Sequence, residues 1–105
     1  MTAQEHVDRF NAAVRGGDFT AFAATFHPDA VMTFVGPPVG PFVGREAIAA
    51  GYEAQPPTDT MTILSVRRDS GAEVVGFRWD HGGTGTITIR RAADGLITAL
   101  TVAFD

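Results

Sequence analysis

The sequence contains no cysteine and no lysine, and each absence removes a class of chemistry. Without thiols the protein has no disulfide, no thiolate nucleophile and no soft-metal site, and nothing in it requires an oxidising compartment. Without lysine amines it cannot form a Schiff base, hold pyridoxal phosphate covalently or use a lysine as a general base. We therefore expect no cofactor, and a reducing cytoplasm is the default compartment.

Positive charge and long apolar runs are also scarce. The formal net charge is −4, and four of the arginines form two isolated pairs, Arg67-Arg68 and Arg90-Arg91, rather than a stripe. Phosphate binding needs clustered positive charge, so we expect no nucleic-acid partner. Charged residues recur through the first helix pattern, and no run approaches the roughly 20 apolar residues of a membrane span. We expect a soluble cytoplasmic protein with no membrane partner.

The sequence does contain enough apolar material for one core. Hydrophobic residues make up 45% of the 105 residues. A chain of this length buries roughly two-thirds of its unfolded surface. No internal repeat, linker or low-complexity segment divides it, so we expect a single domain over residues 1–105.

Two helices are predicted from clear start and stop signals. Thr2 and Glu5 form a capping box, apolar residues then recur at helical spacing, and Gly16-Gly17 predicts the end of the first helix. Residues 45–52 predict another short helix, which follows a loop rich in glycine and proline.

Between them, an aromatic pattern predicts a further helix. Asp18 is a suitable N-cap residue. Three phenylalanines then follow at spacings of three and four, which places them on one helical face: Phe19, Phe22 and Phe26. The segment His27-Pro28-Asp29 predicts the end of this helix.

Strand patterns occupy the remaining sequence. Residues 30–35 predict a short strand, and the prolines and glycines of residues 36–44 predict a loop without regular structure. After Pro56-Pro57 the apolar residues alternate, and short glycine-containing turns separate four predicted strands: 60–68, 73–81, 84–91 and 96–104. Turns this short give an antiparallel meander. Three helices on one face of a curved sheet make an α+β cone, and the gap between the layers is the natural ligand site.

Four stretches resemble the nuclear transport factor 2-like superfamily: residues 26–52, Val7-Asp8-Arg9-Phe10, Gly17-Asp18-Phe19 and residues 94–105. This superfamily includes ketosteroid isomerases, limonene-epoxide hydrolases and SnoaL-like polyketide cyclases, all built around one conical pocket. The resemblance implies a cystatin-like α+β roll, with three N-terminal helices packed on a curved, mostly antiparallel sheet. It also implies that residues 1–105 form one SnoaL-like domain.

The resemblance does not extend to the catalytic groups of the isomerases. Those enzymes use an aspartate base, a tyrosine and a protonated aspartic acid. The matching positions in this sequence are Phe34, Phe10 and a residue at or beside Ile87. Phenylalanine and isoleucine neither accept nor donate a proton, so steroid isomerisation by that mechanism is not expected.

The epoxide hydrolases of the superfamily use an arginine between two aspartates, and half of that set is present. Arg78-Trp79-Asp80 resembles the first half, because residues two apart on a strand point to the same face. The second aspartate falls at Val102, and the water-positioning tyrosine and asparagine fall at Met32 and Phe34. Within an apolar pocket, Arg78 and Asp80 would form a charge-assisted pair that perturbs the pKa of Asp80.

The strand register at residues 77–81 leaves two alternatives open. Hydrophobicity alone favours Phe77, Trp79 and His81 inward, with Arg78 and Asp80 in water. The superfamily resemblance favours the opposite register, with the aromatic pair on the outer sheet face, where related proteins dimerise. We predict Arg78 and Asp80 inward and a homodimer through the outer face.

Other residues complete the predicted site. Tyr52 is a second polar candidate, one and two helical turns after Ile48 and Arg45. The histidines lie on different predicted elements without a carboxylate at ligand spacing, so we expect no metal site and favour surface or capping roles for them. The predicted apolar lining, which could equally be a filled core, consists of Phe10, Met32, Phe34, Leu100, Val102 and Phe104.

Two hypotheses follow for the function. In the first, the protein binds an apolar metabolite and performs cofactor-free acid–base chemistry as an isomerase, cyclase or epoxide hydrolase. Asp80 would move the proton, Arg78 would hold it ionised, and Tyr52 would stabilise developing negative charge. In the second, the protein is a non-catalytic ligand-binding or dimerisation module whose pocket is closed by its phenylalanines, which predicts no cavity above ~300 Å³.

Overall fold

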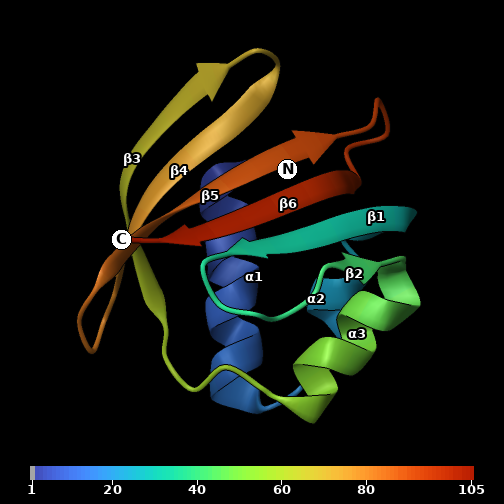
Figure 1. Cartoon of the computed structure of the whole chain (residues 1–105), viewed down its shortest axis with the longest axis horizontal. Helices are drawn as coiled ribbons and strands as arrows, with labels where there is room; N and C mark the ends of the chain where they lie inside the picture. The colour runs from blue at the N-terminus through green and yellow to red at the C-terminus, as the bar shows by residue number, and fades with distance from the viewer. Residues whose placement is uncertain (1) are drawn as a thin grey trace.

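The computed structural model describes residues 2–105, which form a six-stranded sheet and three helices (Figure 1). In chain order the elements are α1 (Ala3–Gly16), α2 (Thr20–Ala23), β1 (Phe26–Val35), β2 (Phe42–Val43), α3 (Arg45–Ala54), β3 (Met61–Asp69), β4 (Ala72–Trp79), β5 (Thr84–Arg91) and β6 (Ile97–Phe104). The sheet order is β2-β1-β6-β5-β4-β3. All neighbouring strands are antiparallel except β1 and β6, which are parallel. Within the described chain, no helix is long and apolar enough to cross a membrane.

The α+β fold and the antiparallel meander predicted from the sequence are confirmed. Each of the four predicted meander strands is present, with ends that differ by at most two residues. The capping box of α1 is also present: the Thr2 hydroxyl accepts from the Glu5 N–H, and the Glu5 carboxylate accepts from the Thr2 N–H. Gly17 ends α1 with a φ of 70°, a left-handed conformation that glycine adopts without strain.

The predicted second helix is largely wrong. Only the four residues of α2 are helical, and Phe26 begins β1 instead of ending the helix. Phe26 pairs with Ile97 of β6, and the Ile97 N–H donates to the Thr25 carbonyl. Strand pairing therefore overrides the helical spacing of the phenylalanines. The Gly/Pro loop is also not wholly irregular, since its last residues form β2 against β1.

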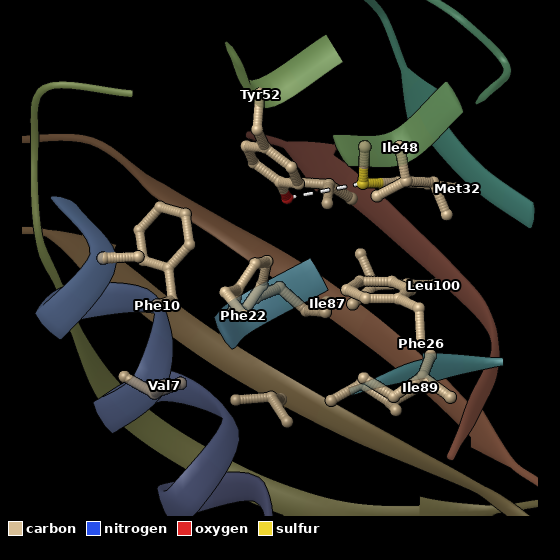
Figure 2. Packing of buried hydrophobic residues seen from close by; sticks show 14 of the residues in the cluster. Val7, Phe10, Phe22, Phe26, Met32, Ile48, Tyr52, Ile87, Ile89 and Leu100 are labelled. Atoms are coloured by element: carbon tan, nitrogen blue, oxygen red, sulfur yellow. Dashed lines mark hydrogen bonds between the residues drawn. The ribbon is translucent and has the colours of Figure 1, made fainter. Parts of the chain in front are cut away.

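The helices and the sheet share one core. Val7 and Phe10 of α1, Phe22 of α2 and Ile48 of α3 are buried in the same cluster as the inner side chains of β5 and β6. Figure 2 shows these side chains meeting between α1, α3 and the sheet. This layer between helices and sheet is the interior of the predicted cone.

Candidate functional site

A cavity of about 60 Å³ lies inside the cone. Its wall includes five of the six predicted ligand-binding residues: Phe10, Phe34, Leu100, Val102 and Phe104. The sixth, Met32, is buried behind this wall and contacts Tyr52. A water molecule occupies about 30 Å³ of liquid volume, so the cavity has room for about two waters. It falls well below the ~300 Å³ of ordinary ligand pockets.

Three aromatic rings form one end of the cavity, which we call the aromatic mouth: Phe34, Trp79 and Phe104. The Phe104 ring is parallel to Phe34, with ring centroids 6.4 Å apart, and nearly parallel to Trp79 at 6.4 Å. Phe104 is 40% exposed, and the other two are half-buried. Phe22 and Ile87 also line the cavity, and both are buried in the core.

Tyr52 is one of the few polar side chains on the cavity wall. Its ring stacks on Phe19 with centroids 4.9 Å apart. Its hydroxyl donates to the Met32 sulfur at 3.4 Å, as Figure 2 shows. A thioether is a weak acceptor, so this hydrogen bond is weak. It uses the hydroxyl proton of Tyr52 and leaves the oxygen lone pairs available. Burial raises the pKa of the Tyr52 hydroxyl, and the side chain therefore stays neutral.

His6 also lines the cavity, and the sequence analysis missed it. The surface or capping role favoured for the histidines is wrong for His6, which is 3% exposed and packs on Phe22 with ring centroids 5.2 Å apart. Burial, and secondarily the positive charge of Arg91, lowers the pKa of His6 to about 4. One signal could have located it: His6 lies one turn before Phe10 on the apolar stripe of α1.

The predicted inward orientation of Arg78 and Asp80 is wrong. Both residues are exposed, whereas Phe77 is fully buried and Trp79 reaches the aromatic mouth. The outer face of the sheet therefore carries the charged pair instead of the predicted aromatic pair. Pairing with β5 decides this, because Val75 lies opposite the buried Ile87 and so places Phe77 on the inner face. Turning Arg78 inward would bury a charge and expose Phe77.

Asp80 has its own partners on the outer face. The hydroxyls of Thr60 and Thr62 both donate to its carboxylate, the second at 2.7 Å. These hydrogen bonds, together with the nearby positive charge of Arg78, hold the pKa of Asp80 below its ordinary value. Asp80 is thus an ionised surface carboxylate. The sequence had instead predicted an acid inside the pocket with a perturbed pKa.

Other polar groups lie outside the cavity. His81 is exposed, and its Nδ1 lies 2.7 Å from the Asp59 carboxylate, which raises the pKa of the imidazole. Arg91 forms an ion pair with Glu73 in a mostly buried position. Within residues 2–105, no three histidine, aspartate or glutamate side chains gather closely enough to hold a metal ion.

A larger hollow of about 600 Å³ lies between α2 and α3. Its rim carries the exposed carboxylates of Asp18, Glu46 and Glu53. Ligand sites usually enclose their ligand among apolar side chains with a few polar groups. The smaller inner cavity has that composition, so we place the candidate site there despite its size.

Comparisons with solved structures identify the fold. A SnoaL-like protein of unknown function from Burkholderia thailandensis aligns over 98% of this chain and 93% of its own, with a TM-score of 0.78 and 14% identity. A protein from Sphaerobacter thermophilus aligns over 100% and 97%, with a TM-score of 0.74 and 22% identity. A protein from Mycobacterium tuberculosis aligns over 95% and 88%, with a TM-score of 0.70 and 21% identity. At these identities the similarity shows the fold alone.

The sequence comparison is consistent with the structural one. No curated protein matches the chain. The model of the SnoaL-like domain matches residues 7–100, which include nearly all of the helices and strands described above. The chain therefore belongs to the SnoaL-like domain family, within the nuclear transport factor 2-like superfamily.

Proposed function

We propose that this protein binds a small, neutral, apolar molecule in its cone and catalyses no reaction there. One observation carries the proposal: among the described residues that line the cavity there is no carboxylate and no arginine. Transfer of an apolar ligand from water to an apolar wall is favourable, whereas an ionic ligand would find no opposite charge there. The family and its fold are compatible with many activities, so the function has to be inferred from the residues of the site.

The titratable groups on the wall support a non-catalytic role. General acid–base catalysis works best when the pKa of the group lies near the working pH. Burial moves the pKa of His6 down to about 4 and the pKa of Tyr52 upward, so both side chains are neutral near pH 7. Neither is poised to exchange a proton with a ligand at that pH.

The acid–base mechanism considered from the sequence needs three residues at one ligand. Tyr52 lies on the cavity, whereas Arg78 and Asp80 are exposed on the opposite face of the sheet. An isomerase, cyclase or epoxide hydrolase using this set would require β4 to pair in a different register. We therefore favour the binding function over the catalytic one.

Ligand entry requires a side chain to move. An engineered protein cavity of roughly 150 Å³ accepts benzene, and the cone holds only about 60 Å³. Phe104 is the best candidate for this movement, because it is the most exposed of the mouth residues and lies at the end of β6. Turning its ring outward would lengthen the cavity toward solvent.

We also propose that the protein is a cytoplasmic homodimer that associates through the outer face of the sheet. Small and β-branched side chains form one row across that face, at paired positions on four strands: Thr33, Thr101, Thr88 and Val74. A flat row of this kind suits face-to-face packing of two sheets. Thr101→Arg should convert a dimer to a monomer, measured by light scattering after gel filtration.

The binding proposal is tested by titrating neutral apolar compounds of increasing size against the fluorescence of Trp79, the single tryptophan. Trp79 lines the cavity, so a ligand there should shift its emission. The same ligand should raise the melting temperature, since saturation at a hundredfold the Kd stabilises a protein by about 2.7 kcal/mol. Phe104→Ala should strengthen binding of ring-sized compounds by removing the exposed part of the mouth.

Asp80→Asn is the control, because it alters a charged residue next to Trp79 that lies on the opposite face of the sheet. It should leave the affinity unchanged. If neither the wild-type protein nor Phe104→Ala binds any compound of the series, the cone is a packed core and the proposed function is wrong.

A further inference from the structure

The Nδ1 atom of His6 is a buried polar atom without a hydrogen-bond partner among residues 2–105. Such atoms are rare in folded proteins, and each calls for an explanation in terms of an unseen partner or a function. His6 lies on the wall of the inner cavity, where most of its neighbours are hydrocarbon. The cavity is therefore a neighbouring space from which a partner can reach this residue without displacing the core.

The surroundings of His6 restrict the chemistry of that partner. The Phe22 ring packs against the imidazole, and the positive charge of Arg91 is near enough to act on it. Arg91 is itself paired with Glu73, so this corner has no spare negative charge for a cationic ligand. A carboxylate ligand would have to leave water for an apolar wall, which is costly. The partner must therefore be neutral.

We propose that His6 determines ligand specificity by forming a hydrogen bond, through Nδ1, with a single hydroxyl group on an otherwise apolar ligand. The ligand class is a compact, neutral alcohol. This inference rests on the proposed binding function and adds the polar group that the ligand carries. A neutral imidazole nitrogen is a donor in one tautomer and an acceptor in the other, and a hydroxyl can satisfy both.

Water alone is a poor alternative occupant. A buried water usually makes about three hydrogen bonds to protein. Apart from His6, the polar side chains on the wall are Tyr52, whose oxygen can still accept, and the indole of Trp79, so a water with three bonds would have to reach all three side chains at once. A ligand hydroxyl needs only one such bond, because its apolar body supplies the remaining affinity.

The experiment compares cyclohexanol with methylcyclohexane, two ligands of similar shape that differ by the hydroxyl. Affinities are measured from Trp79 emission for the wild type, His6→Leu and Tyr52→Phe. Relative to the partition of each ligand into hexadecane, the wild type should prefer cyclohexanol by at least about tenfold, because a hydrogen bond formed in an apolar medium is worth more than its net value against water. His6→Leu should lose this preference, and Tyr52→Phe should keep it.

A second measurement uses the wild-type protein and does not depend on whether His6→Leu folds. The ¹⁵N chemical shifts of the His6 imidazole should change on addition of cyclohexanol and stay constant with methylcyclohexane. Unchanged shifts with bound cyclohexanol, equal relative affinities for the two ligands, or a preference that persists in His6→Leu would each overturn the inference while the binding function stands. Binding of neither ligand to the wild type or to Phe104→Ala would overturn both.

Discussion

Successive side chains of β4 point to opposite faces of the sheet, and the two faces differ in burial and in charge. On the inner face, Phe77 is fully buried and Trp79 closes the cavity. On the outer face, Arg78 and the following Asp80 are exposed, and Asp80 is hydrogen-bonded to the threonines of the neighbouring chain segment. The face on which a side chain lies decides whether it can reach the cavity, and resemblance to a catalytic motif does not. The cone interior is left with neutral side chains only.

The largest expected effect is on the free energy of unfolding, which substitutions on the inner and outer faces of β4 should change by different amounts. Phe77→Ala removes a fully buried ring that packs on Trp79 with centroids 5.1 Å apart, and it should lower the free energy of unfolding by about 3–5 kcal/mol. Arg78→Ala, one residue later on the outer face, should change it by less than about 0.5 kcal/mol. Urea denaturation of both variants measures the difference. Equal losses would contradict the assigned register.

The second effect is a loss of stability in acid, which arises from His6 on the wall of the inner cavity. His6 has its pKa lowered from 6.5 to about 4, so between these values the unfolded chain binds a proton that the folded protein excludes. Stability from His6 is fully present above pH 6.5 and is lost as the pH falls to about 4. The shift corresponds to about 3 kcal/mol at about 1.4 kcal/mol per pKa unit.

This acid effect is measured as the difference between the wild type and His6→Leu. Carboxylates titrate in the same range in both proteins, so their contribution cancels in the difference. The free energy of unfolding should fall more steeply from pH 6.5 to 4 in the wild type. Parallel profiles would show that the imidazole is accessible to protons in the folded protein.

A smaller effect is expected at Tyr52, which combines an inner position with a weak hydrogen bond. Tyr52→Phe keeps the stacking on Phe19 and removes only the bond to the Met32 sulfur. Because a thioether accepts weakly, the free energy of unfolding should fall by less than about 1 kcal/mol. Thermal denaturation measures it, and a loss of several kcal/mol would indicate that the hydroxyl holds a buried water or a second partner.

The smallest effect is expected at Asp80. Asp80→Asn removes a charge from an exposed site and retains an oxygen that can accept from Thr62. Stability should change by less than about 0.5 kcal/mol, and ligand affinity by less than the error of a fluorescence titration. A large loss of affinity would return Asp80 to the candidate site and would revive the catalytic hypothesis.

Much of the fold was predictable because its signals are local. The capping box at Thr2 and Glu5 and the left-handed Gly17 depend on a few neighbouring residues, and both are present as expected. The meander strands followed from alternation and from turns with glycine. For the candidate site, the prediction found most of the apolar wall, but it omitted His6 and misplaced Arg78 and Asp80.

The failures occurred where local patterns compete with long-range pairing. Phe26 has helical spacing from Phe22, yet it lies in β1 because Ile97, far along the sequence, offers it a strand partner. For β4, both registers satisfy the alternation rule, and only the partners decide between them. Val75 pairs with Ile87 of β5, and both point into the core, which fixes Phe77 on the same face.

Residue type and spacing over a few positions were enough to predict α1, α3, the meander strands with their turns and the apolar character of the cone. Tertiary structure decided which side chains share the cavity, how much space remains between them and which charges stay in water. The physical reason is that burial is a property of packed layers: a pKa shift, an unpaired Nδ1 or a closed mouth exists only after the helices have been placed on the sheet.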